Sequence, residues 1–98
     1  MNAPDINRSI LRMHIAAIEQ KYPIRIIGLL PRGSVGHMYD VENAVEFLAE
    51  KRPGLDLLGL AGAEVDLGDR LGRPVGIVLE SGLKGREAEE LPRLAEAI

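Results

Sequence analysis

The range Ile24–Leu30, IRIIGLL, is an almost continuous apolar run with several β-branched residues. A short run of this kind predicts a buried strand. Pro31 follows it directly, and Gly33 and Ser34 come soon after, so the strand must end in a turn. A glycine–serine turn behind a strand can cradle a phosphate with its backbone N–H groups. This part of the sequence therefore predicts a central strand and, after it, an anion site at Gly33 and Ser34, to which Arg32 adds a cation.

Two acids follow the turn at positions one residue apart, Asp40 and Glu42. We predict a second strand over Asp40–Leu48, with Val45 and Phe47 on its apolar face. Acids at i and i+2 of a strand point to the same face, so both can reach one magnesium ion. The alternative is that Asp40 and Glu42 belong to the solvated face of a half-buried strand, together with Ala44 and Glu46, the next two residues on that face.

The rest of the chain alternates between helical and extended patterns. We predict helices near residues 5–21, 55–71 and 86–98, and a third strand over Val75–Leu79. The expected apolar faces of the first two helices are Ile6, Ile10, Met13, His14, Ala17 and Ile18, and Leu57, Leu58, Ala61, Glu64, Val65 and Leu71. The predicted fold is a single α/β (α+β) domain over residues 1–98, in the order α-β-turn-β-α-β-α. Its three-stranded mixed sheet carries the helices on one face.

Composition excludes several classes of function. The formal net charge is −3 and the isoelectric point about 5.3, which argues against a surface that binds duplex nucleic acid. The absence of cysteine excludes disulfides and thiolate metal sites. No apolar run approaches the roughly 20 residues that span a bilayer, and no signal-peptide core is present at the N-terminus. We therefore expect a cytoplasmic protein with no membrane partner.

The order of elements and several motifs resemble the minimal nucleotidyltransferases, small relatives of the polymerase-β-like transferases. That family reads G-L-F-G-S, then a loop, then S-D-x-D-x-x-V-E-F. GLLPRGS at 28–34 resembles the first part, and DVENAVEF at 40–47 resembles the second. LDLLGL at 55–60, LGRPVGIVLESGLK at 71–84 and the closing LAEAI resemble the family's second half. The resemblance covers residues 24–98.

The departures from the family pattern fall on the active site. The family places about ten residues between its Gly-Ser pair and the first acid, whereas five residues separate Ser34 from Asp40. A second alignment sets Pro31 and Arg32 under the Gly-Ser pair, which removes a phosphate-binding N–H. Family members have V-D-[LIV]-V on the last strand, where this chain has Gly76 in place of the third acid.

The resemblance implies transfer of a nucleoside monophosphate from a triphosphate, ATP above all, to a hydroxyl acceptor. Arg32, Gly33 and Ser34 are then the nucleotide-binding residues, and Asp40 and Glu42 are the catalytic residues that hold magnesium. With Gly76 in place of the third acid, the predicted active site is eroded. The alternative is a non-catalytic module, an antitoxin-like partner of a small helical HEPN-type protein as in toxin–antitoxin pairs, or a module that binds a second copy of itself as a homodimer.

Overall fold

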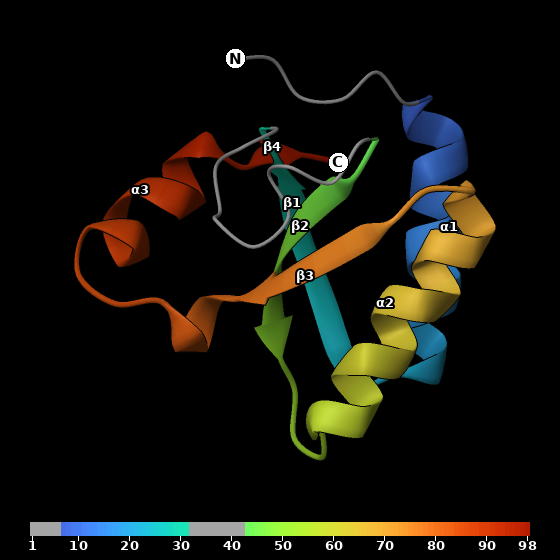
Figure 1. Cartoon of the computed structure of the whole chain (residues 1–98), viewed down its shortest axis with the longest axis horizontal. Helices are drawn as coiled ribbons and strands as arrows, with labels where there is room; N and C mark the ends of the chain where they lie inside the picture. Colours follow the sequence, from blue (N-terminus) through green and yellow to red (C-terminus); the bar gives the residue numbers. More distant parts are fainter. Residues whose placement is uncertain (1–6, 32–42) are drawn as a thin grey trace.

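The computed structural model describes residues 7–31 and 43–98. Within these ranges, two long helices alternate with strands, and a short helix and strand close the chain (Figure 1). The elements are α1 (Arg8–Lys21), β1 (Ile24–Leu30), β2 (Val45–Lys51), α2 (Leu57–Leu71), β3 (Val75–Leu79), the 3₁₀ turn η1 (Glu80–Gly82), α3 (Arg86–Leu94) and β4 (Glu96–Ala97). None of the helices in this part of the chain has the length and apolarity needed to cross a membrane.

The strands form one mixed sheet in the order β3-β2-β1-β4. β1 is antiparallel to both β2 and β4, and β2 is parallel to β3 through the crossover helix α2. An irregularity between Ile26 and Gly28 shifts the register of β1 against β2 by one residue. As a result the main core is faced by Ile24 and Ile26 before the shift and by Leu29 after it.

Three details of the predicted fold are wrong. The sheet has four strands in the described residues, because Glu96–Ala97 pairs with β1 instead of continuing the last helix. α3 ends at Leu94, because Ala95 is extended, and the N–H of this C-cap residue donates to the carbonyl oxygen of Leu91. The second strand begins at Val45, since positions 43 and 44 are not extended in the sheet; the predicted start at Asp40 is therefore too early.

The helices cover both faces of the sheet, in contrast to the predicted single covered face. α1 and α2 lie side by side on one face, and α3 lies on the other side (Figure 1). The first face holds the main aliphatic core around Phe47 and Leu67. On the second face Leu30, Leu48 and Leu91 form a smaller cluster. Alternation along β2 matches the prediction, because Val45 and Phe47 belong to the main core.

The buried faces of the two long helices match the prediction only in part, at Ile18 of α1 and at the partly buried Leu71 of α2. The buried residues of α1 are Leu11, Ile15 and Ile18, and those of α2 are Ala63 and Leu67, with Leu60 and Leu71 partly buried. Both helices carry two apolar stripes in sequence, and periodicity alone does not choose between them. In α2 the predicted residues Leu57, Leu58 and Val65 are exposed.

An ion-pair cluster joins α1 to α2 at the surface. The carboxylate of Asp66 accepts from Lys21 Nζ at 3.1 Å and from Arg70 Nε at 3.0 Å, and the Tyr22 hydroxyl lies at 3.4 Å. Its hydrogen bond with Lys21, together with the two cations, lowers the pKa of Asp66. The same hydrogen bond and the charge of Asp66 raise the pKa of Lys21. Asp66 is therefore a structural residue that joins the helices.

Two helix carboxylates complete the hydrogen bonding of the sheet. Glu19 Oε2 accepts from the N–H of Ile26 at 2.8 Å, beside the irregularity in β1. Glu64 Oε2 accepts from the N–H of Ile77 at 2.7 Å, on the edge strand β3. An N–H on an edge strand that already has a hydrogen-bond partner is not available to pair with a strand of another molecule. Glu64 therefore faces the sheet because it binds this N–H, although the other residues on that side of α2 are apolar.

Candidate functional site

The five residues predicted to bind nucleotide and metal do not fall in the described part of the chain. They are Arg32, Gly33, Ser34, Asp40 and Glu42, and all lie within residues 32–42. The structure does show the two ends between which this segment runs. β1 ends at Leu30, which stands opposite Glu46 of β2 in the antiparallel register. The segment therefore leaves and rejoins the sheet at one end, the end where β3 begins.

The start of β2 is fixed by the turn between α2 and β3. Arg73 Nε donates to the carbonyl oxygen of Asn43 at 2.9 Å, and the N–H of Val45 donates to the carbonyl of Pro74 at 2.9 Å. Asn43 adopts φ 66°, a left-handed conformation that asparagine tolerates better than most residues. The turn itself is closed by Gly72, the left-handed C-cap of α2. These contacts hold the chain in place where it emerges from the segment 32–42.

Glu46 is a buried acid at this end of the sheet. Its exposed fraction is 4%, and no other charged residue in the described ranges is buried to this degree. It points to the α3 side of the sheet, because its neighbours Val45 and Phe47 belong to the core on the other side. Burying a carboxylate costs free energy, so such a group in a natural protein is a candidate for function. The expectation that Ala44 and Glu46 form a solvated face is wrong, since Ala44 is also buried.

The strand beside Glu46 supplies no second acid. In the parallel register Glu46 stands next to Gly76, and the antiparallel neighbour on the other side is Leu30. No group of three acid or histidine side chains suited to a metal ion occurs in residues 7–31 and 43–98. A magnesium ion at this position would therefore need Asp40 or Glu42 as well as Glu46. The described donors by themselves do not form a magnesium site.

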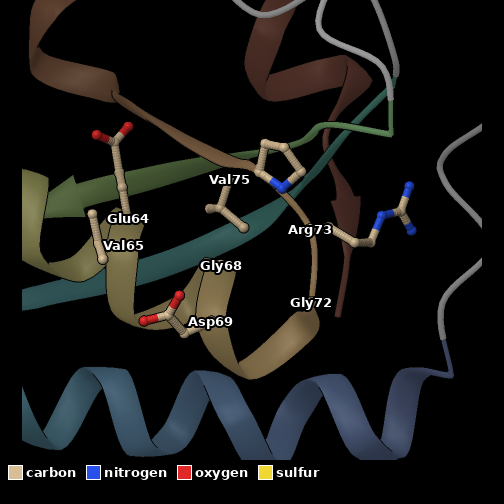
Figure 2. Close-up of a pocket in the computed structure, with 8 residues that line it drawn as sticks. Glu64, Val65, Gly68, Asp69, Gly72, Arg73 and Val75 are labelled. Carbon is tan, nitrogen blue, oxygen red and sulfur yellow. The ribbon is translucent and has the colours of Figure 1, made fainter.

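An open pocket lies beside the outer edge of β3 (Figure 2). Its volume is about 610 Å³, and its lining includes the charged residues Glu64, Asp69 and Arg73. Two of these three charged groups already have structural partners, because Glu64 binds the N–H of Ile77 and Arg73 binds Asn43. The pocket is also on the α2 side of the strand, away from Glu46. We therefore place the candidate site at Glu46 and Gly76.

Comparisons with known proteins give one informative match. No family model matches the chain, and no curated protein matches it. A solved structure described as a "putative minimal nucleotidyltransferase" superposes with a TM-score of 0.69 at 26% sequence identity, covering 93% of this chain and 91% of the other. The chain has the fold of a minimal nucleotidyltransferase. The match extends over nearly all of both chains, so the likeness includes the small α3 side as well as the main core.

The V-E-F part of the family pattern falls on Val45, Glu46 and Phe47 at the start of β2. The predicted metal ligands Asp40 and Glu42 therefore come just before β2 in the sequence, and they lie outside the described residues. In the parallel register the third acid position, Gly76, stands beside Glu46. Sequence reasoning assigned Glu46 to a solvated face because acids are mostly exposed, and only the packing around β2 shows that it is buried.

Proposed function

We propose that this chain is a nucleotide-binding protein with the minimal nucleotidyltransferase fold and a reduced catalytic site. The observation that carries the proposal is the register of β2 and β3. It pairs a buried acid, Glu46, with Gly76, at the strand end beside the predicted phosphate turn. One of the three positions where the family resemblance expects an acid, Gly76, carries no carboxylate. We therefore infer retained binding with strongly impaired transfer.

In this proposal the segment 32–42 contacts the nucleotide. The backbone amides of Gly33 and Ser34, the Ser34 hydroxyl and the Arg32 guanidinium bind the triphosphate. Asp40 and Glu42 would hold magnesium from the segment, and Glu46 would add a carboxylate from β2. Magnesium would supply charge neutralisation on the phosphate oxygens. Burial of Glu46 keeps its carboxylate out of bulk water, where an electrostatic interaction with a cation is stronger.

The impaired step is the transfer itself. A hydroxyl oxygen of the acceptor forms a bond to the α-phosphorus, the bond to the bridging oxygen breaks, and pyrophosphate leaves. The hydroxyl proton must then go to a base, and Gly76 offers none. General-base catalysis contributes roughly 100- to 10,000-fold, so transfer should be slower than in an intact relative by at least about that factor. Such a loss affects rate more than nucleotide affinity.

Amide NMR with added ATP and magnesium tests the proposal. We expect shifts for residues 33–40 and for the two strand positions Glu46 and Gly76, with a dissociation constant of roughly 0.1–1 mM, equivalent to about −5.5 to −4 kcal/mol. Asp40→Asn should remove the magnesium dependence of binding. Glu46→Gln, which keeps the shape of the side chain, should weaken that dependence without unfolding the protein.

Asp69→Asn is the matched control, because Asp69 is an exposed acid of α2 on the other side of the sheet. It should bind ATP and magnesium like the wild type. Binding of equal strength by the wild type, Asp40→Asn and Glu46→Gln in excess magnesium would show that these acids are not metal ligands and would contradict the proposal.

The second candidate function is a non-catalytic interaction module. The glycine at the third acid position, Gly76, favours it, because a protein that only binds a partner has no need of that acid. By family resemblance its partner is a small helical HEPN-type protein, in an antitoxin-like pair. This function predicts an amide spectrum that does not respond to ATP at all, and so the same titration separates the two candidates.

A further inference from the structure

The outward side of α2 carries a second apolar stripe. Leu57 is 84% exposed, Leu58 is 83% exposed and Val65 is 64% exposed, and the exposed Ala61 lies between them. The stripe that faces the core lies on a different side of the same helix. Exposed apolar residues scattered singly are ordinary, but a continuous stripe along one helix marks an interaction surface.

The centre of the stripe is small and its ends are large. Leu58 precedes Ala61 by three residues and Val65 follows it by four, so the large side chains lie about one turn away on either side. A two-fold axis that passes through Ala61 would therefore set Leu58 of one helix against Val65 of another, twice. A small residue at the crossing point lets two helices approach closely, while the large residues interlock beside it.

Charges around the stripe are also arranged for a two-fold partner. Lys51 and Arg52 are exposed at the end where α2 begins, and Asp69 is exposed near the end where α2 finishes. In an antiparallel pair each cationic end meets the acidic end of the other copy. Arg70 does not oppose this arrangement, because it lies half a turn around the helix from Ala61 and binds Asp66.

We propose that the chain forms a homodimer through α2, with the helices antiparallel about a two-fold axis at Ala61. Such an interface is isologous, so the same stripe serves both copies. The stripe from Leu57 to Val65 is about 12 Å long at ~1.5 Å per residue. A stripe of this length buries less than the ~800 Å² per partner of a standard interface. The dimer is therefore a weak one, with a dissociation constant of about 0.1 mM. The proposal is independent of nucleotide binding.

Disulfide trapping tests the geometry, because the chain has no cysteine of its own. Ala61→Cys places two thiols at the axis, and a disulfide requires Cα atoms roughly 4.4–6.8 Å apart. We expect Ala61→Cys to oxidise to a covalent dimer at least 10-fold faster than Ser81→Cys, an exposed control in η1 on another part of the molecule. Equal oxidation rates for the two variants would overturn the proposed axis.

Sedimentation at 0.01–1 mM, a range set by the expected affinity of about 0.1 mM, tests the contacts. Leu58→Glu should raise the dissociation constant at least 10-fold, and Asp69→Lys should raise it several-fold. Combining Asp69→Lys with Lys51→Glu and Arg52→Glu should restore dimerisation, since the opposite ends again attract each other. A wild type that stays monomeric up to 1 mM would overturn the proposal. The stripe would then be a surface for binding a different protein.

Discussion

Thirteen buried residues pack between the sheet and the helix pair α1 and α2, whereas three, Leu30, Leu48 and Leu91, pack between the sheet and α3. On the first face, the carboxylates of Glu19 and Glu64 also accept hydrogen bonds from backbone N–H groups of the strands. The second face holds the buried acid Glu46 beside a glycine. Apolar burial supplies most of the stability of a small domain. The first face therefore contributes most of the stability of this fold.

This difference would let the site on the α3 side change while the fold persists. Residues on that side contribute less to the packing, so a glycine at position 76 is compatible with a stable sheet. The candidate site and the main core share the strands but use opposite sides of them. Variants on the two faces should therefore have separable effects on stability and on binding.

The largest expected effect is on the first face. Phe47→Ala removes the largest fully buried side chain and should cost ~3–5 kcal/mol of unfolding free energy. Leu91→Ala on the other face should cost less, about 2 kcal/mol, because only a small cluster surrounds it. Urea unfolding followed by circular dichroism measures both. A larger loss of unfolding free energy for Leu91→Ala than for Phe47→Ala would contradict the claim that the first face contributes more to stability.

An intermediate effect is expected where β4 joins the sheet. A Cβ added at Gly28 would lie 2.8 Å from the carbonyl oxygen of Glu96 and 3.1 Å from the Cβ of Ala95. Gly28→Ala should thus displace β4 and cost ~1–3 kcal/mol. Hydrogen exchange at the C-terminus should rise while exchange in β2 and β3 stays slow. Unchanged protection at Ala97, the register partner of Gly28, would contradict this account.

The smallest effect concerns the ion pairs between α1 and α2. The pKa of Asp66 is lowered in the folded protein, so its contribution to stability is present above pH 4 and is lost as pH falls below about 4. The pKa of Lys21 is raised, so its contribution is lost only as pH rises above about 10.5. Asp66→Asn should lower the urea midpoint slightly at pH 7 and not at pH 2.5.

Asp69→Asn serves as the control for that prediction when it is measured at low protein concentration. Asp69 makes no ion pair within the described ranges, so its loss should leave the midpoint unchanged at both values of pH. A gap between wild type and Asp66→Asn that is as large at pH 2.5 as at pH 7 would mean that the charge of Asp66 does not stabilise the helix pair.

Sequence reasoning reached most elements of the fold and few details of the site. The apolar run of β1, the alternation in β2 and the β3 strand have simple periods, and the structure confirms them. Helix faces were missed because α2 has two apolar stripes, and contacts such as Glu64 with Ile77 decide between them. β4 was missed because two residues carry no pattern. The buried acid Glu46 was assigned to a solvated face, because a lone acid in a strand pattern does not reveal its burial. The predicted site residues themselves lie outside the described part of the chain.

Our central proposal is that the metal-binding position lies beside Glu46 and Gly76, and that Gly76 replaces the third acid that the family resemblance expects. Gly76→Asp would set a second carboxylate beside Glu46 on the neighbouring strand, roughly 5 Å away in the sheet. Thermal unfolding with and without 5–10 mM manganese or magnesium, about the concentration that a weak site requires, is the direct measurement. The account predicts that Gly76→Asp is less stable than the wild type without metal and gains several degrees with it, whereas Gly76→Asn does not respond. The same metal response in Gly76→Asp and Gly76→Asn would contradict the account.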